Sequence, residues 1–189
     1  MEKKYELTDE TKVLESGEVL HRIWALRNFS DVSAGDLGGF VSSEYNLSHD
    51  GECWIYDHGV VCGRARVRNN AIVADVAIVR GRATIAGNAI VYGNAIISGV
   101  ARLGDNERVG GKAYIINKWD VLYVKGLGSA HRGTTMYKTK DGGVEVVCGC
   151  FRGSLDEFEN EVVLTHGDSK FAREYLAFAE VAKIYFGLK

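Results

Sequence analysis

A period of six residues governs the middle of this sequence. Residues 51–122 divide into twelve consecutive blocks of six without an insertion, and the fifth position of every block is a branched aliphatic residue. The third position is alanine in eight blocks and Cys or Gly in two more, and only Glu107 and Trp119 break this pattern. Every block begins with Gly, Asp or Asn, which tolerate positive φ angles and favour turns. This arrangement indicates a stacked β-solenoid.

The blocks resemble the hexapeptide repeat of left-handed parallel β-helices, which reads aliphatic-x-x-x-small-x and places three blocks in one triangular coil. This resemblance implies four coils, and a strand spacing of about 4.8 Å gives a stack of about 19 Å. Antiparallel hairpins are the alternative, but they would not require a turn residue at every sixth position. The predicted fold is therefore mainly β: a left-handed parallel β-helix of about four coils, an N-terminal β cap and a small C-terminal α+β module.

The segments on either side of the repeat divide the chain into three expected parts. Residues 1–44 form an N-terminal β-hairpin cap, because two strand patterns flank the turn-forming pair Ser16 and Gly17. Such a cap covers the unpaired backbone and the apolar core that a solenoid end exposes. Residues 45–122 form the β-helix, and residues 123–189 form the C-terminal module.

The C-terminal module is predicted to contain two strands followed by two helices. After a flexible connector at 126–129, strands at 134–140 and 144–148 flank a glycine turn. A helix over 154–164 begins with a capping box, and a second helix over 169–186 carries aromatic residues at helical spacing. This pattern predicts a compact ββαα unit with an aromatic core.

Composition and charge narrow the class of protein. The chain has 189 residues, of which 46% are hydrophobic, and a net charge of -2, which does not favour nucleic-acid binding through bulk charge. The sequence shows no run of eighteen apolar residues and no leader pattern, so we expect a cytoplasmic protein without a membrane or nucleic-acid partner. Cys148 and Cys150 are close together, but a Cys-x-Cys pair without further ligands is a weak metal signal. We therefore expect neither a metal nor a cofactor.

If every third block stacks, the outward positions of the repeat form three faces, of which two are apolar. A monomer rarely exposes contiguous apolar patches larger than a few hundred Å². Either the terminal modules fold back over these faces or copies of the chain pack together, and we expect a homo-oligomer. The expected interface residues are Trp54, Tyr56, Ile72, Ile78, Ile90, Tyr92 and Ile96.

The third face collects arginines. The residues of this basic edge are Arg64, Arg66, Arg68, Arg82 and Arg102. Guanidinium groups match the geometry of phosphate, so five of them on one edge of an acidic protein predict an anion site. The expected partner is a phosphate-bearing small molecule or an acidic protein, and a solvated charged face without a ligand is the alternative.

Two further features of the repeat are polar. Asn70, Asn88 and Asn106 recur at one corner, where stacked asparagines satisfy one another and tolerate left-handed backbone, so we expect a structural role. Glu107 falls at a small inward position, where an unpaired buried carboxylate costs on the order of several kcal/mol. We therefore expect that the last coils open outward around Glu107 or that a basic side chain lies beside it.

A second candidate ligand site lies in the C-terminal module. Imidazole, guanidinium, hydroxyl and ammonium donors gather there in a short stretch, and this set suits phosphate and ribose. The candidate residues are His131, Arg132, Thr134, Thr135, Tyr137, Lys138 and Arg152. Solvated strand residues without a ligand are the alternative. If the module binds a ligand, reversing the charge of Arg132 or Lys138 is expected to release it.

Several segments resemble a group of phage and prophage proteins that combine β-helical repeats with a shared C-terminal ββαα module. These segments are YELTDETK, HRIWALRNF, GDLGGFV, GSAHRGTTMYKTKDGGVEVVCGCFRGSLDEFENEV and THGDSKFAREYLAFAEVAK. The resemblance implies a phage-encoded accessory protein of the bacterial cytoplasm. It implies a non-enzymatic role in which the protein counters bacterial defence by binding a nucleotide-type signal or a host defence protein.

Two other functions remain as alternatives. The repeat also resembles that of hexapeptide acyltransferases, in which a catalytic histidine lies near an inserted loop where two subunits meet. The repeat here has no inserted loop, and its only histidine, His58, follows Asp57 at a turn position. We therefore assign no catalytic residue. An architectural oligomer without a ligand is the other alternative.

Overall fold

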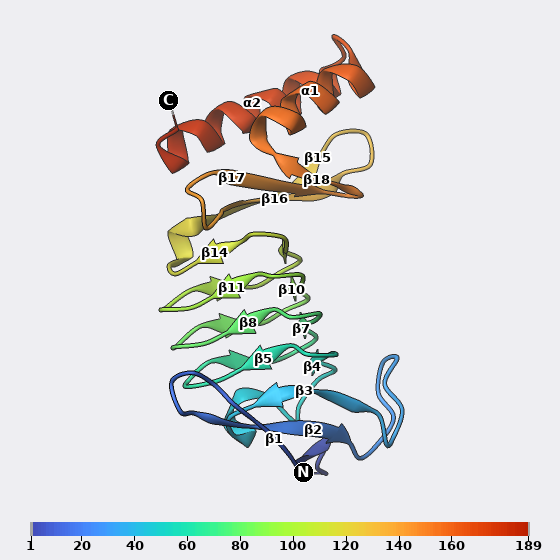
Figure 1. Cartoon of the computed structure of the whole chain (residues 1–189). Coiled ribbons are helices and arrows are strands. Elements are labelled where there is room, and N and C mark those ends of the chain that lie inside the picture. The colour runs from blue at the N-terminus through green and yellow to red at the C-terminus, as the bar shows by residue number, and fades with distance from the viewer. Residues whose placement is uncertain (1, 189) are drawn as a thin grey trace.

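The computed structural model describes residues 2–188 as an elongated molecule built along one axis (Figure 1). A β-hairpin lies at the N-terminal end, short parallel strands form the middle, and a sheet covered by two helices closes the C-terminal end. The mainly β fold that the repeat predicts is confirmed, with a solenoid of about four turns and a small helical part at the C-terminus.

Strands of two residues each build the solenoid. They are β4 (Trp54–Ile55), β5 (Val60–Val61), β6 (Arg66–Val67), β7 (Ile72–Val73), β8 (Ile78–Val79), β9 (Thr84–Ile85), β10 (Ile90–Val91), β11 (Ile96–Ile97), β12 (Arg102–Leu103), β13 (Arg108–Val109) and β14 (Tyr114–Ile115). Strands three blocks apart pair in parallel and form three sheets, β4-β7-β10-β13, β5-β8-β11-β14 and β6-β9-β12. Val67 pairs with Ile85 and Ile85 pairs with Leu103, as the period predicts.

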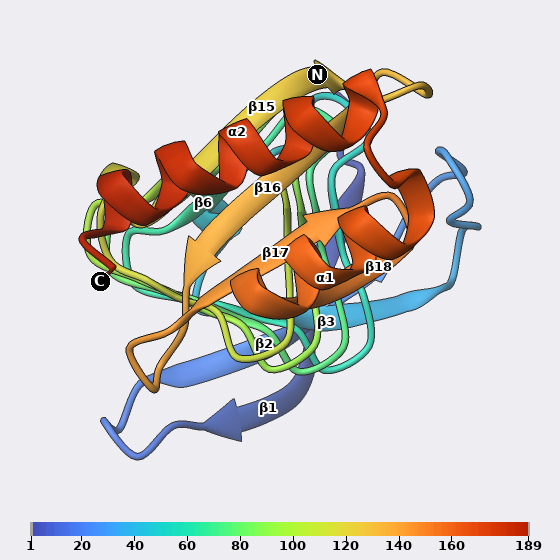
Figure 2. The same ribbon diagram turned by 90° about the horizontal axis from the view of Figure 1, so that it is seen from above.

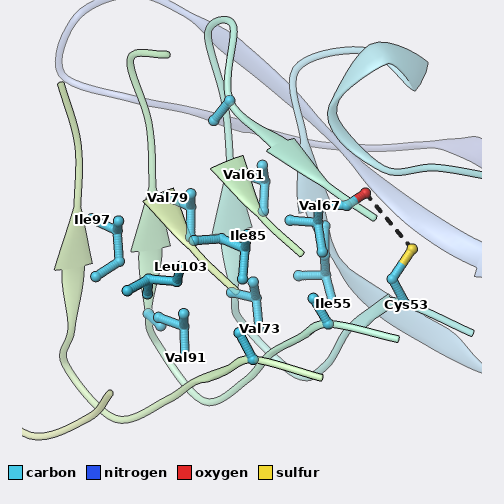
Figure 3. Close-up of a cluster of buried hydrophobic side chains, with 14 of the residues drawn as sticks. Cys53, Ile55, Val61, Val67, Val73, Val79, Ile85, Val91, Ile97 and Leu103 are labelled. Carbon is cyan, nitrogen blue, oxygen red and sulfur yellow. Dashed lines mark hydrogen bonds between the residues drawn. The ribbon is translucent and has the colours of Figure 1, made fainter. Parts of the chain in front are cut away.

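The inward positions of the repeat form a dry core. The alanines at the third position and the branched aliphatic residues at the fifth are buried, and Figure 3 shows the aliphatic side chains stacked from Ile55 to Leu103. The first positions of the first eleven blocks hold positive φ angles, including Asp57, Asn69 and Gly81. The chain therefore turns a corner every six residues without interrupting the core.

One corner carries the asparagine ladder that the sequence predicts. Asn70 Nδ2 donates to Asn88 Oδ1 at 3.1 Å, and Asn88 Nδ2 donates to Asn106 Oδ1 at 3.3 Å. The backbone N–H of Glu52 donates to Asn70 Oδ1 at 3.4 Å. The three side chains therefore satisfy one another along the stack, which confirms their structural role.

Parallel stacking begins before the first block of the repeat. The N-terminal strands are β1 (Tyr5–Val13), β2 (Val19–Ala25) and β3 (Leu37–Val41). β1 and β2 form the expected hairpin, and β3 pairs antiparallel with β2 and parallel with β5. A 3₁₀ turn at Glu44–Asn46 follows, and Leu47 bridges in parallel to Val67. The stack thus includes residues that precede the expected boundary at residue 45.

The N-terminal cap covers Trp54. The rings of Tyr5 and Phe29 pack edge-on against its indole at centroid distances of 6.2 and 5.3 Å, and Trp54 is 1% exposed. Trp54 therefore faces the cap, and its assignment to an oligomer interface is wrong. The Tyr56 hydroxyl is also engaged within the chain, because it donates to Asp31 Oδ1 at 2.6 Å.

The twelfth block leaves the solenoid. Lys118–Asp120 forms a 3₁₀ turn, and Trp119, which stands at the small inward position, is 64% exposed. An indole has no room at a position that holds alanine in most other blocks of this close-packed core. The chain then enters β15 (Val121–Leu127), which pairs with β16 and not with β12. The prediction of a twelfth repeat strand is therefore wrong.

The C-terminal module has four strands where the sequence predicts two. The antiparallel sheet has the order β15-β16-β17-β18, and two helices follow it. The bounds are β16 (Arg132–Lys138), β17 (Val144–Cys148), β18 (Phe151–Ser154), α1 (Leu155–His166) and α2 (Lys170–Phe186). The expected connector at 126–129 is the end of β15 and the turn into β16. The predicted capping box is confirmed, because the Glu157 N–H donates to Ser154 Oγ at 3.2 Å.

This sheet lies between the solenoid end and the helices, which cross its outer side (Figure 2). The N–H of Arg108 donates to Thr135 Oγ1 at 3.1 Å, and the N–H of Gly110 donates to Tyr137 Oη at 3.3 Å. Met136, between them on the same strand, belongs to the core under the helices. The module is therefore the cap of the C-terminal end of the solenoid.

Glu107 occupies its inward position without a cation. Its Oε2 accepts from the Gly104 N–H at 2.6 Å, and the coil stays closed because β13 still pairs with β10. Among the residues that the structure describes, no Lys, Arg or His nitrogen lies within 4 Å of this carboxylate. Neither expected arrangement is therefore found. Burial raises the pKa of Glu107, against the lowering effect of the Gly104 hydrogen bond.

Replacing Glu107 with Gln is expected to raise the melting temperature at neutral pH and to change it little near pH 4. A carboxyl with a raised pKa binds more protons in the folded than in the unfolded state, so stability falls as pH rises through the folded pKa. Gln does not ionise, so the variant does not lose stability in this way, and its amide oxygen can still accept from the Gly104 N–H. Thermal melts from pH 4 to 8 measure the difference, with the exposed Glu52→Gln as the control for net charge. A lower melting temperature for Glu107→Gln at pH 8 would contradict this account.

Candidate functional site

An open groove of about 590 Å³ lies on the third face, where β6 and β9 meet the 3₁₀ turn after β3. We call it the arginine groove, and its lining residues are Ser43, Tyr45, Gly63, Arg64, Arg66, Arg82 and Thr84. It thus brings together three of the five arginines that the sequence assigns to the basic edge. Ser43 and Tyr45 precede the repeat, so the period contains no signal for them.

The backbone ladder sets the spacing of the groove's charged side chains. The N–H groups of Arg64 and Arg82 each donate at 2.8 Å to a glycine carbonyl one coil further on. The two arginines therefore occupy the same corner on successive coils, about 4.8 Å apart along the axis. Arg66 and Thr84 lie side by side in the β6-β9 ladder. The positions of these side chains depend on backbone pairing more than on side-chain packing.

Tyr45 orients one guanidinium in the groove. The Arg66 guanidinium carbon lies 3.7 Å from the centroid of the Tyr45 ring, and Tyr45 is 51% exposed. A guanidinium in this position is held by its attraction to the ring face while its N–H groups stay available at the edge. The pair therefore forms one wall of the groove with free hydrogen-bond donors.

The arginines of the basic edge form no ion pairs in the described part of the chain. Among residues 2–188, no arginine of the basic edge has an Asp or Glu oxygen within 4 Å. Glu18, at the lower end of the corner, instead accepts from the Gly63 N–H at 2.9 Å. Several guanidinium groups without counter-charges create a local field that attracts anions. The groove can therefore bind an anion without first breaking an ion pair.

The remaining two arginines of the basic edge lie beside the groove. Arg68 lines a neighbouring hollow of about 340 Å³, which also contains Tyr45 and Arg66. Arg102 is exposed on β12, one coil beyond Thr84. Both arginines extend the charged surface, but neither lines the arginine groove itself.

His49 borders the neighbouring hollow and is held by the cap. Its ring stacks on Tyr5 at a centroid distance of 4.4 Å, and its Nδ1 accepts from the Lys4 N–H at 3.2 Å. Its Nε2 is buried without a hydrogen-bond partner in the described part of the chain. Burial lowers the pKa of the ring. This histidine therefore packs in the cap.

The second candidate set, in the C-terminal module, does not form one site. Thr134, Thr135 and Tyr137 are buried, and the last two hold the module on the solenoid. Burial raises the pKa of the Tyr137 hydroxyl, which also donates to Glu145 Oε2 at 3.2 Å. Lys138 Nζ pairs with Asp120 Oδ1 at 3.1 Å. These four residues are therefore structural.

The other three residues of this set point to different places. His131 is exposed in the turn before β16, where its φ angle is +48°. Arg132 lines a hollow of about 280 Å³ beside Tyr175 and His166, and Arg152 lines a separate hollow. A strand alternates its side chains between two faces, so consecutive donors on β16 cannot converge on one ligand. The sequence alone does not tell which face is covered.

Most residues of the expected interface lie on the sides of the solenoid. Ile72 and Ile90 pair in one sheet, and Ile78 and Ile96 pair in another. All four are half-buried within one chain, as is Tyr92. These side chains present partly open apolar surface, in contrast to Trp54.

Two kinds of feature do not occur in residues 2–188. No three His, Cys, Asp or Glu side chains are grouped so that they could hold a metal ion. Neither helix is long and apolar enough to cross a membrane.

Comparison with known proteins gives one informative relative. No protein-family profile matches the chain. A protein named uncharacterized acetyltransferase YdcK, from Escherichia coli strain K12, is 31% identical over 85 residues. The match covers 38% of this chain and 26% of that protein, so the chain spans about a quarter of the relative's length. The match and the stacked coils together support a hexapeptide-repeat β-solenoid protein.

Proposed function

We propose that this protein is a non-enzymatic binding protein whose arginine groove holds a phosphate-bearing ligand. The proposal rests on three guanidinium groups, those of Arg64, Arg66 and Arg82, which share one open groove. Among residues 2–188, no carboxylate oxygen lies within 4 Å of these guanidinium groups. Guanidinium groups donate paired hydrogen bonds to phosphate oxygens. The hydroxyls of Ser43 and Thr84 add donors to the same surface.

The lining of the groove favours binding over turnover. Among the described residues, its lining includes no histidine, cysteine or carboxylate that could act as a general base or as an activated nucleophile. The donors present stabilise negative charge but have no partner to move a proton. A ligand bound there would be held and released unchanged.

The resemblance to phage and prophage proteins extends this proposal to a biological role. In this role the protein is phage-encoded, works in the bacterial cytoplasm and counters bacterial defence. It sequesters a nucleotide-type signal, or it binds an acidic surface of a host defence protein. An architectural oligomer without a ligand is the outcome if the groove binds no anion.

We also propose that copies of the chain associate through the sides of the solenoid. The ladders of Ile72 with Ile90 and of Ile78 with Ile96 leave apolar surface partly open on two faces. Burying apolar surface stabilises by about 25 cal/mol per Å². The two ends are covered by the cap and the module, so the side faces supply the contact.

Acyl transfer is the second candidate function, and the name of the E. coli relative favours it. A groove of about 550 Å³ lies along one corner of the solenoid, with Val76, Ile78 and Ile96 as its apolar part and Lys112 and Lys140 as its cations. His58 lies at the same corner, because its N–H donates to the carbonyl of Asp75 at 3.0 Å. His58 is exposed and does not line this groove, which makes acyl transfer the weaker candidate.

The variant Arg82→Glu is expected to weaken the binding of inorganic pyrophosphate by at least tenfold. A hydrogen bond to a charged group is worth about 1.5–3 kcal/mol, and the new carboxylate also repels the ligand. Isothermal titration calorimetry at low ionic strength measures the affinity. Arg80→Glu, an exposed arginine on another face, makes the same change in net charge. Equal losses in both variants would mean that bulk charge, and not the groove, binds the anion.

Ile90→Glu is expected to lower the oligomeric mass in solution. A glutamate on the apolar side face would lose its hydration on association, which opposes the contact. Light scattering after size exclusion measures the mass, and Thr84→Glu on the third face is the matched control. A wild-type protein that is monomeric at all concentrations would contradict the association.

The acyl-transfer candidate predicts that the protein binds coenzyme A and that His58→Ala abolishes acetyl transfer. Calorimetry measures the first property, and release of free thiol from acetyl coenzyme A measures the second. Pyrophosphate binding should be unchanged in His58→Ala, because His58 does not line the arginine groove. Absence of coenzyme A binding in the wild type would remove this candidate.

A further inference from the structure

The corner that carries Arg64 and Arg82 becomes apolar on its upper coils. Val100 is 56% exposed, Ile116 is 38% exposed and Trp119 is 64% exposed. These are large apolar side chains in a region where the coils below carry guanidinium groups. The solenoid core is already complete beneath them, so they do not serve the packing of the coils.

Backbone pairing places these residues in one column. Arg82 donates its N–H to the Gly99 carbonyl, and Val100 donates its N–H to the Ile116 carbonyl at 3.0 Å. A side chain at Gly99 would touch Ile116, so the two coils are in close contact at this corner. The 3₁₀ turn with Trp119 follows immediately and appears in yellow beyond β14 in Figure 1. The order along the corner is therefore Arg64, Arg82, Val100 and then the turn that contains Trp119.

Trp119 presents an open aromatic surface at the top of this column. Lys118 Nζ lies over one face of its ring, 4.3 Å from the centroid, so a base would stack on the opposite face. Trp119 is exposed because it cannot enter the small inward position of the repeat. An exposed indole beside cations is the kind of surface on which a nucleobase stacks.

We infer that the ligand of the arginine groove is a nucleotide, with its phosphates on Arg64 and Arg82 and its base against Val100 and Trp119. This inference rests on the proposed function and adds where the phosphates and the base of the ligand lie. Arg82 and Trp119 are separated by two coils, about 10 Å along the axis. A nucleotide with several phosphates at one end and a base at the other matches this order of side chains.

Recognition of this kind tolerates different bases. Stacking depends on the flat face that every base has, whereas the column offers few donors and acceptors for a base edge. Inorganic polyphosphate would use the arginines but leave Trp119 unused. An acidic peptide would also use the arginines, but it would gain little affinity from an indole at a fixed distance from them. The contribution of Trp119 therefore distinguishes the nucleotide from these ligands.

The test compares ATP with inorganic triphosphate on the full chain at low ionic strength without magnesium. ATP is expected to bind more tightly by about 5- to 150-fold, because a stacked base adds about 1–3 kcal/mol. Trp119→Ala is expected to remove this difference and to leave the affinity for triphosphate unchanged. Trp119→Phe keeps an aromatic ring and should retain most of the difference in affinity between ATP and triphosphate. ATP, but not triphosphate, should quench the emission of Trp119.

The control is Trp24→Ala, which removes a tryptophan that is 39% exposed on β2, outside the groove. This variant should bind ATP as the wild type does. Equal affinities for ATP and triphosphate, with no effect of Trp119→Ala, would overturn the nucleotide assignment and leave the proposed phosphate site intact. Binding of both ligands that is insensitive to Arg82→Glu would overturn the phosphate site itself.

Discussion

The fold depends on backbone hydrogen bonds between coils, which set each strand residue beside the residue 18 positions further along the chain. Because each short strand pairs with the equivalent strand one coil away, a residue type that recurs in the sequence recurs at the same place in space. Aliphatic residues thereby become one core, and asparagines become a hydrogen-bonded ladder. The arginines of the groove are positioned by the same ladder, so the candidate site and the fold have a common cause.

The period of six residues is sufficient to predict the solenoid, because burial of positions 3 and 5 decides the local structure. Contacts made by residues outside the repeat cannot be predicted from the neighbouring sequence. Lys4 is fully buried, and its Nζ donates to the carbonyl of Cys53 at 2.8 Å, yet nothing near residue 4 predicts this. Burial lowers the pKa of Lys4. The sequence also predicts only two of the four strands of the C-terminal sheet, in part because β15 begins where the repeat predicts a twelfth strand.

The residues of the candidate site also divide into those that the repeat predicts and those that it does not. Arg64, Arg66 and Arg82 follow from the face assignment, because stacking converts sequence spacing into neighbouring positions. Tyr45 could not be assigned, since it reaches Arg66 through a 3₁₀ turn that lies outside the repeat. The candidate ligand residues of the C-terminal module do not form one site for a different reason. A run of donors on β16 looks continuous in sequence, but the strand divides it between the solenoid and the helices, and Tyr137 became part of the cap.

The two covered ends limit how this molecule can assemble. The outermost strand at the N-terminal end is β1, whose pairing with β2 is irregular between Leu7 and Thr11 and which carries exposed charges at Asp9, Glu10 and Lys12. At the opposite end the helices lie over the final sheet (Figure 2). Irregular and charged edges resist the addition of further strands. Growth along the axis by strand addition is therefore disfavoured at both ends, which leaves the side faces of the solenoid for any contact between copies.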